Sequence, residues 1–519
     1  MKNYIKYFGI LALGMVACEP EFENPVNEAG AYTSGEANFS NYVAIGNSMT
    51  AGYADGALYI TGQQNSFPNI LAQQFSIVGG GEFKQPLMAD NAGGLLLNGN
   101  QITSNRRVLA FNAQGVPSPA VYGGTATTEI TDHLSGPFNN MGAPGAKSYH
   151  LLAPGYGNVE GVAAGLANPF FARFASSGQT TIIADAVAQD PTFFSLWIGN
   201  NDVLGYATSG GVGVDQTGNM NPATYGSNDI TDPQVFAAVY SQLVNQLTAT
   251  GADGVLLNIP DVTSLPYFTT IPNNAMVLDA ATAASLTAYF RAVAGIFTAG
   301  LIQKGVPAAQ AQALAAQYAI TFNEGPNRFL IDVPVTQTNP LGFRQMTAEE
   351  LLILTINQGA LAQGYGSVQL TPEVMQVLGI LQSGGQPTAE QAQLVLGAVS
   401  GLDDKDVLDA SEIAAVETAT AAYNATIQAM ATANNLAFVD VKALLEQVNE
   451  TGVPFDGGTI TATFATGGAF SLDGIHPTPR GQAFIANNVI EAINETYHAS
   501  VPKVNIGNFA TITPSNNVQ

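Results

Sequence analysis

A serine near the start of the chain and an Asp-x-x-His pair near its end have the residue types that acyl transfer requires. Ser48 ends the fragment Gly-Asn-Ser, and Asp473 and His476 lie in the fragment Asp-Gly-Ile-His-Pro. A serine hydroxyl is a weak nucleophile until a positioned base takes its proton. His476 suits that role, and the carboxylate of Asp473 can orient the imidazole ring and stabilise the imidazolium. The residues therefore predict a serine nucleophile with a histidine base.

Two further fragments contain the hydrogen-bond donors that such a reaction needs. They are Asn-Met-Gly-Ala-Pro-Gly at 140–145 and Gly-Asn-Asn-Asp at 199–202. The transition state of acyl transfer places negative charge on an oxygen, which backbone N–H groups and amide side chains stabilise. A glycine and an asparagine can supply these donors. Together the four fragments predict the hydrolysis of an ester by a serine mechanism.

Short apolar runs surround these fragments and are the elements that must position them. The runs at 41–45, 193–198, 254–259 and 436–441 are each predicted as a buried strand. Ser48 then lies on a turn before a helix, where backbone N–H groups favour a developing anion. A parallel α/β sheet presents its site in this way, at the carboxyl ends of its strands.

The stretch from about 275 to 433 has a different composition, rich in Ala, Gln, Leu and Glu. Its spacing predicts helices over 278–296, 307–318 and about 409–434, with further helix starts at 347–350 and 371–373. We expect a mainly helical insertion that forms a cap or side lobe. The alternative is that these helices are extended crossover helices of the sheet itself.

The four fragments resemble, in the same order, the sequence blocks of the SGNH (GDSL-type) hydrolase family. The resemblance extends over residues 43–477, and a weaker additional block lies at 258–262. The family's Gly-Asp-Ser-Leu block is Gly-Asn-Ser-Met here, so Asn47 stands where the family usually has aspartate. We expect Asn47 to alter the hydrogen bonds of the turn rather than to abolish the chemistry.

The resemblance implies a flavodoxin-like, three-layer α/β fold, with a parallel sheet flanked by helices, over residues 38–519. It implies that Ser48 attacks the ester, that His476 is the base and that Asp473 orients it. The N–H groups of Ser48 and Gly145 and the amide of Asn201 are implied as the oxyanion hole. No cofactor is implied.

The implied activity is that of an esterase or lipase on acyl esters. The residues leave two alternatives open: a carbohydrate (acetyl) esterase acting on glycans, and a catalytically silent surface lipoprotein that binds glycan or lipid. The expected partner is therefore an ester substrate, either a lipid or an acylated glycan.

Composition excludes other classes of partner. The chain has a formal net charge of −24, and only 10% of its residues are charged. An excess of acid repels phosphate backbones, which argues against nucleic-acid binding. The remaining histidines, His133, His150 and His498, lack the spacing of a metal site, so no metal is expected.

The N-terminal residues 1–17 have the features of an export signal: a positive start, an apolar stretch and small residues before Cys18. Cys18 is the only cysteine, and we expect it to be the lipidated first residue of a mature bacterial lipoprotein. The alternative is an ordinary secretory signal with an incidental cysteine. Residues 18–37 are predicted to be a flexible acidic tether.

The tether resembles the signals that send lipoproteins of Bacteroidetes-type bacteria to the cell surface; a tether without an address is the alternative. We therefore expect an exported protein whose lipid anchors it to a bacterial membrane, in particular the outer membrane.

Overall fold

The computed structural model describes residues 32–519. The predicted export signal, the lipidated Cys18 and residues 18–31 of the predicted tether lie outside the described residues.

A parallel sheet of five strands forms the centre of the molecule. The strands are β1 (Tyr42–Gly46), β7 (Asn140–Gly142), β8 (Phe193–Trp197), β9 (Asp253–Leu257) and β18 (Ala437–Val439). Their spatial order is β7-β1-β8-β9-β18, and every neighbouring pair is parallel. Counted along the chain this is the order 2-1-3-4-5 of flavodoxin-like, doubly wound sheets. The predicted α/β class, with a parallel sheet flanked by helices, is confirmed.

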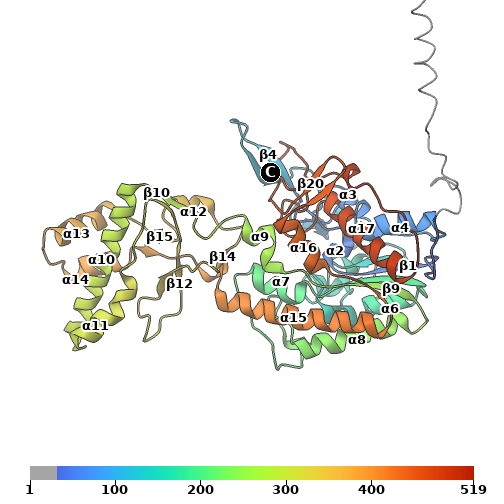
Figure 1. Ribbon diagram of the computed structural model, residues 1–519, viewed down its shortest axis with the longest axis horizontal. Coiled ribbons are helices and arrows are strands. Elements are labelled where there is room, and N and C mark those ends of the chain that lie inside the picture. Colours follow the sequence, from blue (N-terminus) through green and yellow to red (C-terminus); the bar gives the residue numbers. More distant parts are fainter. Residues whose placement is uncertain (1–31) are drawn as a thin grey trace, which may run out of the picture.

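Helices cover both faces of this sheet (Figure 1). On one face, α4 (Phe67–Ile77) packs against α17 (Pro479–Thr496), which also contacts β18 and β9. On the other face lie α6 (Ile182–Val187), α8 (Pro233–Thr248) and α15 (Ala410–Ala433). Because right-handed crossovers that run in opposite directions along a sheet place their helices on opposite faces, this arrangement follows from the strand order.

The central strands are buried on both sides, which explains their continuous apolar sequence. Every residue of β1 and β8 is buried. Two polar groups within these strands satisfy each other, because Tyr42 Oη and Ser195 Oγ are hydrogen-bonded at 2.7 Å. The strands therefore hold their carboxyl ends, where the predicted site residues begin, in a rigid and well-packed frame.

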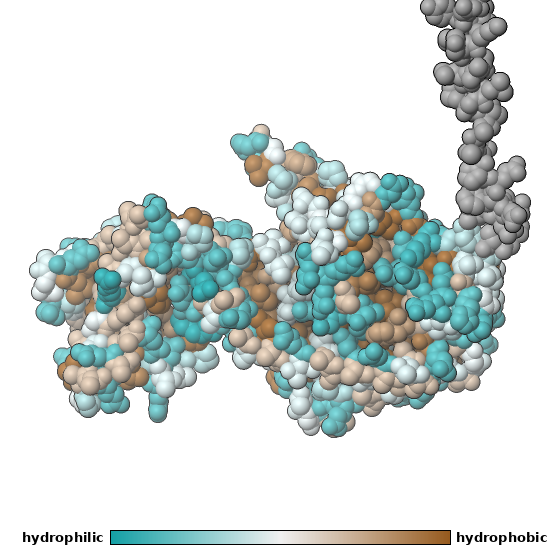
Figure 2. Space-filling model, viewed as in Figure 1, coloured by the Kyte–Doolittle hydropathy of each residue, from teal (hydrophilic) through white to brown (hydrophobic). Residues whose placement is uncertain are grey.

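A side lobe extends from the sheet domain, and a narrow waist joins the two parts (Figures 1 and 2). The chain enters the lobe after α9 (Pro266–Thr269), and β14 (Leu351–Leu352) pairs with β17 (Val407–Leu408) at the waist. The lobe has its own apolar core, separate from that of the sheet domain. Its helices and paired short strands are α10 (Ala280–Gln303), α11 (Ala308–Ala315), α12 (Gln358–Ala362), α13 (Pro372–Gln382), α14 (Ala389–Leu396), β10 (Met276–Leu278) with β11 (Gly325–Asn327), β12 (Leu330–Asp332) with β13 (Phe343–Gln345), and β15 (Ser367–Val368) with β16 (Val399–Ser400).

The range 275–433, predicted as one mainly helical insertion, contains two different parts. Residues 276–408 form the lobe, in which short strands accompany the helices. The last helix of the range, α15, is a crossover helix of the sheet, because Tyr423 stacks on Phe236 of α8 with ring centroids 4.2 Å apart. Each of the two alternatives therefore describes one part of the range.

The helix predicted to start at 347–350 is absent. Glu350 is instead buried and ion-paired with Arg344, and its carboxylate also accepts the N–H of Thr347 at 2.7 Å. These bonds close a turn that leads into β14. Glu350, three positions after Thr347, therefore binds an arginine and does not start a helix.

Among residues 32–519, α10 alone is long and apolar enough to cross a membrane, a test of length and composition that a long core helix also passes. Tyr289, Phe290 and Val293 on this helix are buried in the core of the lobe.

Further short elements surround the sheet domain. A hairpin of β4 (Arg107–Phe111) and β5 (Pro117–Val121) projects from it, and the C-terminal residues run alongside (Figure 1). The others are α2 (Ser48–Ala51), α3 (Ile60–Gln64), α5 (Val159–Val162), α7 (Asn201–Thr208), α16 (Val441–Glu450), the sheet of β2 (Leu95–Leu97), β3 (Asn100–Gln101) and β6 (Thr128–Glu129), and the hairpin of β19 (Val453–Phe455) and β20 (Gly458–Ile460).

Candidate active site

Ser48 is the first residue of α2, directly after β1 and Asn47. Asn47 caps this helix, because its Oδ1 accepts the N–H of Met49 at 3.0 Å. Its Nδ2 donates to Oδ1 of Asn200 at 3.2 Å, and both asparagines are buried. An aspartate at position 47 could keep the first bond but has no hydrogen to donate in the second. Asn47 therefore joins the turn after β1 to the turn after β8.

The structure brings Ser48, His476 and Asp473 together although Ser48 and His476 are 428 positions apart in the chain. Nε2 of His476 lies 2.9 Å from Oγ of Ser48, and its Nδ1 lies 2.9 Å from Oδ2 of Asp473. All three side chains are at most 11% exposed. These contacts are the ones that a nucleophile, its base and an orienting acid require.

The carboxylate of Asp473 is held in its ionised form. Its Oδ1 accepts the backbone N–H groups of Ile475 and His476 at 2.9 and 2.8 Å, and its Oδ2 accepts the N–H of Gly56 at 2.8 Å. Burial alone raises the pKa of Asp473, but the attraction of His476 and these hydrogen bonds outweigh it and lower the pKa well below its usual range. Asp473 is therefore an orienting charge and not a proton acceptor.

A second aspartate, Asp55, fixes the loop that carries Asp473. Its N–H donates to Oγ of Ser471 at 2.9 Å, its Oδ1 accepts the N–H of Leu472 at 3.0 Å, and its Oδ2 accepts the hydroxyl of Tyr59 at 2.8 Å. Asp55 has a left-handed backbone with φ of 56° and is 3% exposed. Sequence reasoning missed this residue, because an Ala-Asp-Gly turn gives no sign of a partner more than 400 positions away.

The groups predicted as oxyanion donors are free to bind a further acceptor. Gly145 has φ of 82°, and a Cβ built there would meet nothing within 4 Å, so its backbone is open. The N–H groups of Ser48 and Gly145 donate no hydrogen bond to any other part of residues 32–519. Nδ2 of Asn201 donates one hydrogen to the carbonyl of Ala146 at 2.9 Å and keeps a second hydrogen for another acceptor. Ser48, Gly145 and Asn201 thus each keep a donor available.

Asp202 anchors the loop that carries Gly145. It is fully buried, and its carboxylate accepts the N–H and the hydroxyl of Ser148 at 2.8 and 2.6 Å. Burial raises the pKa of Asp202, and the bonds from Ser148 oppose that increase. Asn201 and Asp202, which are consecutive, therefore hold the same loop at Ala146 and at Ser148.

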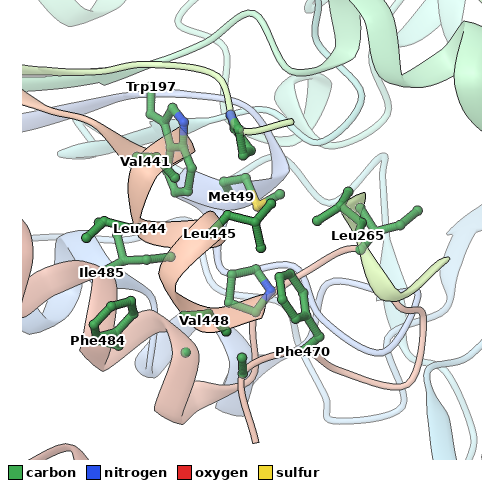
Figure 3. Close-up of a pocket in the computed structure, with 15 residues that line it drawn as sticks. Met49, Trp197, Leu265, Val441, Leu444, Leu445, Val448, Phe470, Phe484 and Ile485 are labelled. Atoms are coloured by element: carbon green, nitrogen blue, oxygen red, sulfur yellow. The ribbon is translucent and has the colours of Figure 1, made fainter. Parts of the chain in front are cut away.

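An apolar cavity of about 60 Å³ lies beside the site, between α16 and α17 (Figure 3). Met49, Ile475 and Pro477, which flank Ser48 and His476, contribute to its wall together with Trp197, Leu445 and other apolar residues. Ser48, His476 and Asp473 do not line it. The cavity therefore belongs to the packing that supports these three residues.

The other histidines lie outside this site. His150 is packed against Tyr156 with ring centroids 4.5 Å apart, and burial lowers its pKa to about 4. His133 contacts the carbonyl of Ala175 through Nε2 at 2.9 Å. Within residues 32–519, no group of three or more His, Cys, Asp and Glu side chains is arranged to hold a metal ion.

Ser48 follows β1 and Asn201 follows β8, so both lie at the carboxyl ends of these strands, where the strand order reverses, and Gly145 lies in the loop after β7. His476 and Asp473 join Ser48 through the two contacts of 2.9 Å. The weaker block at 258–262 links two strand ends, because Nδ2 of Asn258, after β9, donates to Oδ1 of Asp440, after β18, at 2.7 Å. Comparisons with protein-family models, with curated proteins and with solved structures find no match to this chain.

Proposed function

We propose that this protein is a serine ester hydrolase of the SGNH (GDSL) type. One observation carries the proposal: the unbroken relay from Ser48 through His476 to Asp473, with both contacts at 2.9 Å. The free donors at Gly145 and Asn201 support it, because a relay alone does not stabilise an oxyanion.

The geometry suits a two-step acyl transfer. Oγ of Ser48 attacks the ester carbonyl while Nε2 of His476 takes its proton, and the N–H groups of Ser48 and Gly145 and the amide of Asn201 bind the oxyanion. The intermediate collapses, the alcohol leaves with the proton from His476, and an acyl-serine remains. Water then gives its proton to His476, attacks the acyl group and releases the acid, which restores Ser48.

Hydrolysis of p-nitrophenyl esters, from acetate to palmitate, tests the proposal directly. The chain beginning after Cys18 should release p-nitrophenol, and the preferred chain length would separate short-ester from lipid-ester substrates. A fluorophosphonate should add its phosphonyl group to Ser48, which peptide mass spectrometry would locate. The absence of both hydrolysis and labelling would count against an enzyme and favour a silent binding protein.

A carbohydrate esterase is the second candidate, and a groove that contains several hydroxyl groups favours it. The groove has a volume of about 650 Å³ and is lined mostly by hydroxyl and amide side chains with one aromatic ring: Ser264, Thr269, Thr270, Asn449, Thr461, Ala462, Thr463 and Phe464. Hydrogen-bonding groups beside an aromatic ring suit a sugar. Acetylated xylan in the same assay series would test this candidate, with release of acetate as the readout.

Loss of the Asn201 amide should slow the reaction without preventing it. We expect Asn201→Ala to lower kcat by about 10²- to 10³-fold with a small change in KM, because one oxyanion donor is worth about 2.7–4 kcal/mol in the transition state. Steady-state kinetics on p-nitrophenyl acetate would show this. The exposed Asn221→Ala is the matched control, and an equal effect of both changes would exclude Asn201 as a donor.

We also propose that the protein is exported and anchored to a bacterial membrane, in particular the outer membrane, through a lipid on Cys18. The observation behind this is the signal-like sequence that ends at the only cysteine. We expect Cys18→Ser to move the protein from the membrane fraction to the soluble fraction while its specific activity stays the same. Continued membrane association of the variant would contradict the lipid anchor and direct attention to α10.

A further inference from the structure

Arg107 lies next to the turn that supports the catalytic aspartate. It is the first residue of β4, and its N–H donates to the carbonyl of Asp55 at 2.7 Å. Its guanidinium lies against Gly56, where a Cβ would be only 3.0 Å from Nη1. Gly56 in turn donates its N–H to Asp473. Gly56 therefore separates the guanidinium of Arg107 from the carboxylate of Asp473.

Two tyrosines near Arg107 border the loop that carries His476. The ring of Tyr53 packs against the ring of His476, with centroids 4.7 Å apart, and its hydroxyl bonds to the carbonyl of Gly56. The N–H of Tyr267 donates to the carbonyl of Gly474 at 3.0 Å. Burial raises the pKa of both phenols, and the positive charge of Arg107 opposes the increase at each. The charge of Arg107 is thus close enough to act on both tyrosines that border the loop of His476.

The guanidinium of Arg107 has no partner in the part of the chain that the structure describes. None of its nitrogen atoms donates a hydrogen bond, and no carboxylate oxygen lies within 4.0 Å. The neighbouring Arg106 differs, since its Nε donates to the carbonyl of Asn91 at 2.8 Å and its guanidinium lies over the rings of Tyr59 and Tyr122.

An unpaired arginine is unexpected at this position. The chain has 39 acidic residues and 15 lysines and arginines, so carboxylates are not scarce. Arg107 is partly withdrawn from water, and a cation that loses water without gaining a partner is destabilised. Such unfavourable arrangements are expected at functional sites, where a ligand supplies the missing interaction.

We propose that Arg107 binds an anionic group of the ester substrate, with a carboxylate as the first choice. The inference rests on the proposed ester hydrolysis and narrows it to esters that carry a negative charge near the scissile bond. A guanidinium presents parallel N–H donors that match a carboxylate, and sulfate and phosphate share this recognition. The charge belongs either to the acyl group or to the alcohol.

Matched pairs of charged and neutral esters test the proposal. Mono-p-nitrophenyl succinate against its methyl ester places the charge on the acyl side, and 4-acetoxybenzoate against its methyl ester places it on the alcohol side. For one of these pairs, Arg107→Gln should lower the charged-to-neutral ratio of kcat/KM by about 10- to 100-fold, the effect of one charge-assisted interaction. Arg107→Lys should recover part of the ratio, and sodium chloride should reduce the ratio of the unmodified protein.

Arg291→Gln is the control, because it removes the same charge from an exposed position on α10 in the lobe. A ratio that Arg107→Gln leaves unchanged for both pairs, or changes no more than Arg291→Gln does, would overturn the proposal. Equal loss on charged and neutral esters would do the same and leave Arg107 a support of the relay.

A binding measurement separates this inference from the hydrolysis itself. In the Ser48→Ala background, calorimetry with monomethyl succinate should show binding that the additional change Arg107→Gln weakens about 10-fold or more. Weakened binding without hydrolysis by the unmodified chain would retain the anion site and reject the enzyme. Hydrolysis with binding that does not depend on Arg107 would retain the enzyme and reject the anion site. If sulfate or phosphate binds more tightly than monomethyl succinate and displaces it, the ligand of Arg107 is a tetrahedral anion.

Discussion

Replacing Ser48 with alanine is expected to lower kcat for ester hydrolysis by about 10⁶-fold. The oxygen that forms the covalent bond is lost, and no other hydroxyl among residues 32–519 lies within hydrogen-bond distance of Nε2 of His476. The oxyanion donors remain, so a residual rate of roughly 10³- to 10⁴-fold over water is expected. Burst and steady-state release of p-nitrophenol would measure both quantities.

The fold of this variant should be unaffected, because among residues 32–519 the hydroxyl of Ser48 has one hydrogen-bond partner, the imidazole of His476. Thermal unfolding of both proteins would check this, and the exposed Ser76→Ala is the control for a serine removed elsewhere. A second change, His476→Ala, should cost little more in the variant, since residues that act as one unit are not additive. Retained activity in Ser48→Ala would mean that another residue is the nucleophile.

The sheet could be predicted largely from the sequence, because four of its strands have continuous apolar runs. β1, β8, β9 and β18 lie within one or two residues of the predicted runs. The edge strand β7 was not predicted, since it has only three residues and begins with an asparagine. Its place in the sheet comes from pairing with β1, as in Ala44 opposite Asn140. Such pairing depends on the tertiary path and leaves no local pattern.

That Ser48, His476 and Asp473 contact one another could be predicted from their types and order in the sequence. The residues that hold them in place could not. Ser48 and His476 belong to fragments with a chemical meaning of their own. Asp55 and Arg107 do not, because their roles arise only when the turn at 55–56 meets the loop at 471–473. The lobe illustrates a second limit: its strands have two or three residues each, too few for any periodicity to be detected.

Asp473→Asn is expected to lower kcat by about 10⁴-fold while the substrate still binds. An amide cannot stabilise the imidazolium, and its NH₂ group, if it faces Nδ1 of His476, favours the tautomer with hydrogen on Nε2, which cannot accept the proton of Ser48. Steady-state kinetics on p-nitrophenyl acetate would show the fall in kcat, and an unchanged kcat would exclude Asp473 as the orienting charge.

The same change should also reveal how Asp473 stabilises the fold. Its pKa is lower in the folded chain than in the unfolded chain, where an aspartate has a value of about 3.9. The ionised carboxylate therefore stabilises the folded state above about pH 4, and this contribution is lost as the pH falls further toward the folded pKa. The difference in melting temperature between the unmodified protein and Asp473→Asn should be constant near neutral pH and shrink in strong acid. A difference in melting temperature that grew in acid would contradict the ionised state of Asp473 in the folded protein.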